Sequence, residues 1–423
     1  MKILFLSSYV GSHVASSHLA SSRNVAFAKQ GWDMVFYAPT PSRGLTKEEI
    51  KKSRKNRTKY NIEKRQVIHL FRMFREGNNT ILRAFRYTLS AIKEFNRGVF
   101  AKDARSCNVM LISSTPPIQG AMAAMVKKCR RDHIPFVYVL QDIFPDSLVG
   151  TGLAKKDGLL WKIGRRIENF TYRNADKIIV ISQDFKRNIM AKGVPEEKIE
   201  VIYNWVDENA IPPVKDEENE LFEEFGISRE KFRVVYAGNL GNAQNIEIIV
   251  NAARSLKNNP QIEFIIFGKG GLEDEIKATK AKEQLDNLKI LPLQPYERVA
   301  KVYGLGHVCI VACKPGLGGA AMPSKTWSIM SSGRAVLANF DEGELKVIVE
   351  GASIGSATTK PCGVFTKAGD LEGFVAAIEE LSKHPERCVE MGKNGRRFIL
   401  ENLTREVGTR KYVEVIKSVA IKG

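Results

Sequence analysis

Short apolar runs alternate with amphipathic stretches along most of the chain, and this alternation predicts the fold. In the first half, runs rich in β-branched and aromatic residues are predicted to be strands, and the longer stretches between them have helical spacing. Strands that are apolar on both faces and separated by helices form parallel sheets covered on both sides. The expected strands are 2–8, 33–39, 109–114, 136–142 and 177–182, and the expected helices are 16–30, 79–105, 117–132 and 157–175.

The second half repeats the pattern after a break at 207–231, which holds two prolines, a dense acidic run and no strand. The sequence therefore predicts two doubly wound, Rossmann-like α/β domains facing a cleft, 1–207 and 208–404. A C-terminal helix, 405–423, is expected to pack back toward the N-terminal domain. Strands are expected at 233–239, 263–270, 288–293, 308–313 and 335–340, and helices at 244–258, 271–285, 296–305 and 323–333.

Charge divides unevenly between the two halves. The net charge is +18, with +19 in residues 1–200 and −1 in the rest, and it peaks in 51–65, which has eight basic residues and one acidic one. Such a block attracts phosphate, in nucleic acid or on an anionic membrane; the alternative is a solvated loop. No apolar run approaches the roughly 20 residues of a membrane span, and the start of the chain is expected to be a strand rather than a signal peptide.

The segment "VCIVACKPGLGGAAMPSKTW" predicts an anion site. It consists of a strand, a Gly-rich loop and a helix that is expected to start near Pro323. Free amides of Ser324 and Lys325, together with the Lys325 ammonium, suit a phosphate. The alternative is an ordinary surface lysine on a capped helix.

Other glycines follow strands of the same domain. Gly238 and Gly241 lie in "YAGNLGNAQN", and a third strand–Gly–helix turn is "FGKGGLEDE". Backbone nests of this kind approach anions, although any turn uses glycine. Three Gly-rich turns at strand ends of one domain indicate a nucleotide diphosphate group there.

The first half offers a different set of polar residues. Gly11 follows the first strand and permits close backbone approach, and Ser12 and His13 beside it can donate hydrogen bonds. Asp142 ends a strand, where catalytic or substrate-fixing acids are often found. The alternative for Asp142 and Asp146 is helix capping, and the histidine is equally compatible with a structural role.

Several motifs are absent from the sequence. It has no Asp-x-Asp to hold a divalent metal against a diphosphate, no H-E-x-x-H and no G-x-S-x-G. We therefore expect neither a metal nor a cofactor. A transferase that neutralises its leaving group with a lysine and amides fits this lack.

Over nearly its whole length, the chain resembles the retaining two-domain sugar transferases of glycosyltransferase family 4 (GT-B fold). The similarity is greatest to bacterial members that build O-antigen, capsule and exopolysaccharide repeat units. The segments that carry it are "YVLQDIFPDSLVGTG", "ADKIIVISQDFKRNIMAKGVPEEKIEVIYNWVD", "VVYAGNLGNAQNIEIIVNAAR", "MPSKTWSIMSSGRAVLA" and "DEGELKVIVE".

The resemblance implies a donor nucleotide-sugar, most simply a UDP-sugar, in the C-terminal domain and a glycan or lipid-linked acceptor in the N-terminal one. It implies a catalytic role for Asp142 in the cleft and for Lys325 on the donor diphosphate, and a loop role for Gly11. Front-face attack with retention at the anomeric carbon is the implied route. The donor contacts that it implies are Gly238, Asn239, Lys269, Pro323, Ser324 and Lys325.

The chain departs from the family pattern at four positions. Asn239 and Gln244 stand where many members have Arg and Lys, and Ala320 and Ser328 stand where many have the glutamates of an E-x7-E pair. We interpret these changes as a subgroup trait, with Gln244 and Ser328 still beside the donor. The ribose hydroxyls are then expected to contact Glu344 or its neighbour Glu342.

The segment 78–102 predicts a basic amphipathic helix. Apolar residues recur near helical spacing, with arginines and a lysine between them, which is typical of docking to a membrane surface. The alternative is that the apolar stripe is core. We expect a cytoplasmic enzyme, peripheral at the inner face of the cell membrane, with a polyprenyl diphosphate-linked or other glycan acceptor.

Three other protein classes compete with this interpretation. A Rossmann-type oxidoreductase requires G-x-G-x-x-G after the first strand, and "GSHVASS" is not that motif. A nucleic-acid-binding protein fits the charge, but aromatic residues are not interleaved through 51–65, so no nucleic acid partner is expected. A catalytically silent GT-B partner subunit predicts no nucleotide binding at Lys325.

Overall fold

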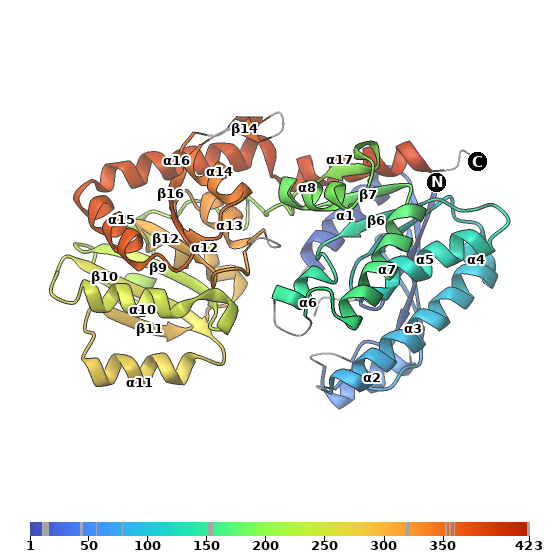
Figure 1. Cartoon of the computed structure of the whole chain (residues 1–423), viewed down its shortest axis with the longest axis horizontal. Helices are drawn as coiled ribbons and strands as arrows, with labels where there is room; N and C mark the ends of the chain where they lie inside the picture. Colours follow the sequence, from blue (N-terminus) through green and yellow to red (C-terminus); the bar gives the residue numbers. More distant parts are fainter. Residues whose placement is uncertain are drawn as a thin grey trace. The chain divides into compact units, whose positions relative to one another are not determined.

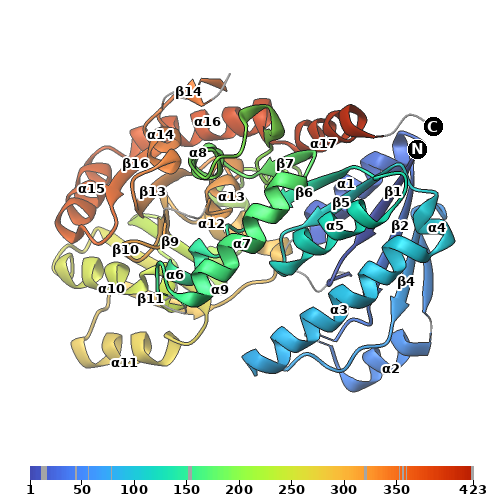
Figure 2. The same ribbon diagram turned by 45° about the vertical axis from the view of Figure 1, so that its right-hand side comes forward.

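The computed structural model describes residues 1–10, 17–42, 45–55, 57–77, 79–150, 155–318, 322–351, 353–354, 357–358 and 360–420. The chain divides into two compact units. Unit 1 comprises Met1–Tyr203 and Glu406–Gly423, and unit 2 comprises Asn204–Arg405. Figures 1 and 2 show an α/β arrangement in each unit.

Unit 1 contains, in its described residues, an eight-stranded sheet with the order β3-β4-β2-β1-β5-β6-β7-β8. Every neighbouring pair is parallel except β3 and β4. The strands are β1 (Lys2–Leu6), β2 (Asp33–Pro39), β3 (Thr58–Asn61), β4 (Gln66–Phe71), β5 (Val109–Ser113), β6 (Phe136–Leu140), β7 (Lys177–Val180) and β8 (Ile199–Val201).

Helices cover this sheet on both faces, as buried apolar strands require. All five residues of β6 are buried. Helices α3, α5 and α7 form one layer (Figures 1 and 2). Helix α17 contacts α1, where the Arg23 guanidinium lies over the Tyr412 ring at 5.6 Å. The helices are α1 (Ser17–Lys29), α2 (Lys47–Lys55), α3 (Thr80–Phe100), α4 (Lys102–Arg105), α5 (Ile118–Cys129), α6 (Asp146–Gly150), α7 (Leu159–Asn174), α8 (Gln183–Ala191) and α17 (Arg405–Val419).

The basic block 51–65 is not simply a solvated loop. Its first residues end α2, and residues 58–65 form β3 and the turn into β4. The strand β4 alternates buried and half-buried positions, the pattern of a strand near a sheet edge. The expected helix 79–105 is interrupted at Ala101, whose backbone is extended, so that it becomes α3 and α4.

Unit 2 contains a six-stranded parallel sheet with the order β11-β10-β9-β12-β13-β16 in its described part. Strand β16 was not expected from the sequence. The strands are β9 (Phe232–Asn239), β10 (Ile262–Lys269), β11 (Leu288–Pro292), β12 (Val308–Ala312), β13 (Ala335–Phe340) and β16 (Gly363–Lys367), with a separate antiparallel pair β14 (Ser353–Ile354) and β15 (Ala357–Thr358). The helices are α9 (Leu221–Glu224), α10 (Ile246–Ser255), α11 (Glu273–Glu283), α12 (Val299–Gly304), α13 (Lys325–Ser331), α14 (Glu344–Glu350), α15 (Leu371–Lys383) and α16 (Pro385–Asn402).

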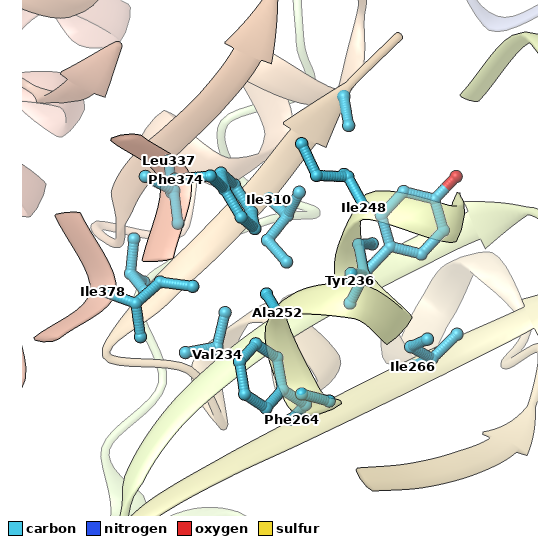
Figure 3. Packing of buried hydrophobic residues seen from close by; sticks show 14 of the residues in the cluster. Val234, Tyr236, Ile248, Ala252, Phe264, Ile266, Ile310, Leu337, Phe374 and Ile378 are labelled. Carbon is cyan, nitrogen blue, oxygen red and sulfur yellow. The ribbon is translucent and has the colours of Figure 1, made fainter. Parts of the chain in front are cut away.

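The core of unit 2 lies between this sheet and its helices (Figure 3). Val234 and Phe264 from the sheet meet Ala252 of α10 and Phe374 and Ile378 of α15, and all five are buried. Side chains of this size stabilise a fold by about 1.5–3 kcal/mol each when fully buried. The core therefore fixes the strand ends from which the loops of unit 2 extend.

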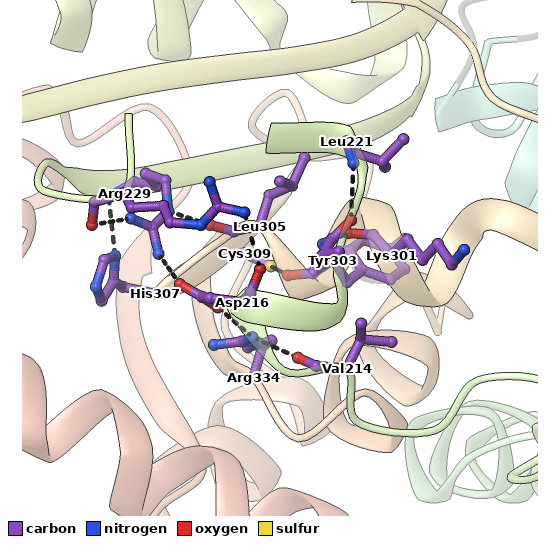
Figure 4. A network of polar contacts seen from close by, with 12 residues as sticks. Val214, Asp216, Leu221, Arg229, Lys301, Tyr303, Leu305, His307, Cys309 and Arg334 are labelled. Carbon is purple, nitrogen blue, oxygen red and sulfur yellow. Dashed lines mark hydrogen bonds and ion pairs between the residues drawn. The ribbon is translucent and has the colours of Figure 1, made fainter. Parts of the chain in front are cut away.

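The segment 207–231, expected to be a break between domains, is held on unit 2 by a buried polar network (Figure 4). Arg233 is 1% exposed, and its guanidinium donates to Asp216 Oδ2 at 2.6 Å and to the Leu305 carbonyl at 2.5 Å. Arg334 donates to the other carboxylate oxygen of Asp216 at 3.2 Å. Burial, with the charge of Arg233 beside it, lowers the pKa of His307 to about 4, and the neutral His307 Nδ1 accepts from the Arg233 amide at 3.0 Å.

Candidate functional site

Three loops of unit 2 extend from one edge of its sheet. Because β10, β9 and β12 are parallel neighbours, their carboxyl ends meet at that edge. The register pairs Gly238 with Gly268 and Asn239 with Lys269, so the expected donor residues Asn239 and Lys269 lie on adjacent strand ends. The sheet therefore brings these two glycine-containing turns together.

Lys325 joins this edge from the first residue of α13. Its Nζ donates a hydrogen bond of 2.7 Å to Tyr236 Oη, and Tyr236 in turn donates one of 2.7 Å to the Asn239 carbonyl. A Cβ atom on Gly238 would lie 2.5 Å from Lys325 Nζ, and the φ of Gly238 is +143°, which favours glycine. The structure thus places the Lys325 ammonium against Gly238, and a Cβ atom at this position would displace it.

The ammonium of Lys325 has no carboxylate within ion-pairing distance in the part of the chain that the structure describes. Burial lowers its pKa to about 8. Desolvation without a counter-charge disfavours the charged form of a lysine, and an anion placed beside it restores that form. An unpaired ammonium at the carboxyl ends of parallel strands suits a phosphate group.

In the turn that follows β9, amide side chains stand where many family members have basic ones. Asn239 Nδ2 donates to Gln244 Oε1 at 3.2 Å, and the left-handed Asn245 then leads into α10. The Lys314 amide donates to the Ala243 carbonyl at 3.0 Å and ties the next loop to this turn. Asn239 and Gln244 therefore hold each other in the positions where a pair of basic residues was expected from the family pattern.

One carboxylate at this edge was missed by sequence reasoning. Asp341 directly follows β13 and accepts hydrogen bonds from the amides of Gly316 and Gly318 at 3.0 and 2.7 Å. It fixes the Gly-rich loop that leads toward α13. Its position after a buried strand is a sequence signal, but the loop that it holds lies 23 residues or more away.

The remaining donor-site residues lie around α13 and α14. The helix begins at Lys325, later than expected, and Pro323 and Ser324 precede it. Their carbonyls accept from the amides of Thr326 and Ser328, at 3.0 and 3.4 Å. Position 320 lies outside the described residues.

Glu344 opens α14 and is buried, whereas its neighbour Glu342 is exposed and lies 3.5 Å from Lys346. Contact of either glutamate with a ribose remains a prediction. Because Glu342 is already held at the surface, Glu344 is the more confined of the two carboxylates.

In unit 1, Asp142 follows β6. Asp142 is exposed as a residue. Partial desolvation raises the pKa of its carboxyl group, and hydrogen bonds from the Ser147 side chain and the Ile143 backbone oppose this rise. Asp146, the alternative cap, is ion-paired with Lys192 at 2.7 Å. Gly11, Ser12 and His13 lie outside the described residues.

Two protein-family models match the chain, one on each half. Residues 25–210 match the model described as Glycosyltransferase Family 4, and residues 217–398 match the model described as Glycosyl transferases group 1. The chain is a glycosyltransferase. The resemblance to glycosyltransferase family 4 and the two α/β domains of the GT-B type are thereby confirmed.

Relatives of this glycosyltransferase include two bacterial proteins assigned to the same activity. WbjE of Pseudomonas aeruginosa is 28% identical over 291 residues, 67% of this chain and 68% of WbjE. WcaI of Escherichia coli (strain K12), assigned to colanic acid biosynthesis, is 28% identical over 252 residues, 58% of this chain and 60% of WcaI. HepE from Anabaena, solved in complex with UDP-glucose, superposes with a TM-score of 0.68 over 99% of this chain and 100% of HepE; at 16% identity this likeness shows the fold alone.

The glycosyltransferase also has a buried carboxyl group that the sequence did not reveal. Glu94 of α3 is fully buried, and burial raises its pKa to about 7. It accepts hydrogen bonds from Ser90 Oγ and Gln119 Nε2, both at 2.7 Å, and Gln119 also donates to Ser8 Oγ at 2.6 Å, just after β1. This network braces the carboxyl end of β1, from which the loop with Gly11 departs.

Proposed function

We propose that this glycosyltransferase moves a sugar from a UDP-sugar to a lipid-linked or glycan acceptor in bacterial surface polysaccharide assembly, with retention at the anomeric carbon and without a metal. The observation that carries the proposal is the Lys325 ammonium, which lies beside Gly238 and has no carboxylate partner among the described residues. The UDP-glucose named in the HepE structure supports the choice of donor, and the assignment of WcaI to colanic acid biosynthesis supports the choice of pathway class.

The proposed chemistry breaks the bond between the anomeric carbon and the diphosphate oxygen. Negative charge then grows on the diphosphate, and a preorganised donor aimed at that charge lowers the barrier. Lys325 is that donor, and the Asn239–Gln244 pair adds neutral hydrogen bonds in place of further cations. The acceptor hydroxyl adds to the anomeric carbon from the same face, and its proton passes to the departing diphosphate.

The acceptor side of the proposal rests on unit 1. Asp142, whose carboxyl group has a raised pKa, is proposed to fix the acceptor hydroxyl. The charge of +19 in residues 1–200 fits an acceptor that carries a diphosphate and a lipid at an anionic membrane face. Among the described residues, no helix has the length and apolarity needed to cross a membrane.

The test is thermal unfolding with UDP, GDP, dTDP, CDP and ADP in turn. A ligand at about 100 times its dissociation constant adds roughly 2.7 kcal/mol to the stability of the folded state. We expect UDP to raise the midpoint most, and NMR of the transfer product to show the anomeric configuration of the donor. No shift with any nucleotide would favour the silent partner subunit, and an inverted product would reject retention.

A further inference from the structure

Helix α3 exposes its large apolar side chains and buries small and polar ones. Ile81, Leu82, Phe85, Ile92 and Phe100 are each more than half exposed. The turn angle of about 100° per residue places these five positions on one stripe roughly 100° wide. The buried face carries instead Arg86, Ser90, Ala91, Glu94 and Gly98.

This stripe resolves the two readings of segment 78–102. The apolar positions 81, 82, 85 and 92 are surface and not core, and Leu89 and Phe95 are half-buried. An exposed apolar stripe of this kind marks an interaction surface. In both views of the structure α3 runs along the outside of unit 1 (Figures 1 and 2).

A cavity of about 720 Å³ adjoins the C-terminal half of the stripe. It lies between that half of α3 and the strands β2, β3 and β4, and Phe100 of the stripe is part of its lining. Its size is within the range of about 300–1,000 Å³ that small-ligand sites occupy. The cavity belongs to unit 1 alone and shares no residue with the Lys325 site.

The lining of this cavity is cationic. Arg57, Arg72, Lys93 and Arg97 contribute four positive charges, and no Asp or Glu is among the lining residues. In the described part of the chain none of the four is ion-paired; Lys93 Nζ donates to the Arg72 carbonyl at 2.9 Å. The nearby Asp103 is already engaged, by His69 at 2.8 Å and by the Tyr37 hydroxyl.

We propose that this cavity binds the phosphate headgroup of an anionic membrane lipid, with the apolar stripe of α3 inserted beside it. An amphipathic ligand fits this surface, because the cationic cavity and the exposed apolar stripe lie on one helix and share Phe100. Four unpaired cations complement a phosphate, and the stripe complements acyl chains. The inference deepens, and rests on, the membrane attachment in the proposed function.

The test is co-sedimentation with vesicles of phosphatidylcholine, with and without phosphatidylglycerol. The variant Arg72→Gln/Arg97→Gln removes two charges from the cavity, and Arg131→Gln/Lys156→Gln removes two exposed charges elsewhere in unit 1. Each basic group at an anionic surface contributes about fivefold to binding, so the cavity variant should bind about 25-fold more weakly than the wild type at low salt. The specific prediction is that the control variant loses much less.

A second variant, Ile92→Ser/Phe100→Ser, tests the stripe and keeps all charges. The inference can therefore still be tested if the first variant does not fold. It should reduce binding to anionic vesicles, while circular dichroism and UDP affinity stay those of the wild type. Unchanged UDP affinity separates this test from the proposed function. Absence of UDP binding in the wild type would reject the proposed donor site and leave the vesicle result intact.

Three outcomes overturn the inference. The first is equal loss of vesicle binding in the cavity and control variants, which indicates diffuse charge. The second is equally tight binding of inorganic pyrophosphate without vesicles, again lost in the cavity variant, which indicates a soluble phosphate ligand. The third is preference for random duplex DNA over vesicles, which indicates a nucleic acid site.

Discussion

Raising the pH from about 7 to about 9 should weaken UDP binding, because Lys325 is the cation that the diphosphate meets. Burial without a carboxylate lowers the pKa of this lysine to about 8, from an ordinary value of 10.5. The bound diphosphate restores the charged form, so the pKa of Lys325 rises again in the complex. Only the free protein therefore loses its proton in this range, and UDP binding takes up a proton.

The magnitude follows from that pKa. At one pH unit above the pKa about one tenth of the free lysine is charged, so the dissociation constant of UDP at pH 9 should be about tenfold larger than at pH 7. Below pH 7 more than about nine tenths of the lysine is charged, so its contribution should change little. The free energy lost over this interval is about 1.4 kcal/mol.

The assay is isothermal titration of UDP at several pH values between these limits, with Lys325→Arg as the matched control. A guanidinium keeps its charge throughout, so the variant should show a flat profile even where its affinity is lower. A flat profile in the wild type would refute the account of Lys325. An equal slope in both proteins would assign the effect to another group.

Three further predictions concern unit 2. Gly238→Ala should weaken UDP binding by roughly ten- to a hundredfold in the same titration, because the new Cβ would displace the Lys325 ammonium. A charge-assisted hydrogen bond of this kind contributes about 1.5–3 kcal/mol. The control Gly271→Ala has open space around its Cβ position and should leave UDP binding unchanged. As the pH falls from about 6.5 to about 4, the folded state should lose up to roughly 3 kcal/mol of stability, because His307 takes up a proton in the unfolded state but stays neutral in the folded one. Urea unfolding of His307→Gln should depend less on pH over this range. Asp216→Asn should lower the free energy of unfolding by about 2 kcal/mol in urea unfolding. The loss is smaller than for a fully buried ion pair, because this carboxylate is 28% exposed. A loss near zero would mean that the carbonyl partners of Arg233 satisfy its guanidinium.

The parallel sheets could be predicted from the sequence because strands buried on both faces carry unbroken apolar runs. Strands such as β6 and β13 are entirely buried and lie within two residues of their expected bounds. The hairpin was missed because β3 lies in the basic block 51–65, whose composition suggested a loop, and because β4 is short and half-buried at every second position. Its pairing partner β2 is supplied by tertiary structure.

The candidate site was predictable in outline but not in its contacts. Gly238, Lys269 and Lys325 were singled out because each stands at a strand end or a helix start. The contact of Lys325 with Tyr236 spans 89 residues, and no local pattern encodes it. The polar buried face of α3 also contradicts the ordinary pattern, since Arg86 and Glu94 are inside while Ile81 and Phe85 are outside.

The central claim is that unit 2 binds the diphosphate of a nucleotide through Lys325, and the most direct measurement is the dissociation constant of UDP for the wild type, Lys325→Ala and Lys393→Ala. Lys393 is an exposed lysine of α16 with the same charge. We predict binding by the wild type, affinity lower by roughly ten- to a hundredfold in Lys325→Ala, and no change in Lys393→Ala. Equal affinities in all three proteins, or no binding of UDP to the wild type, would contradict the account.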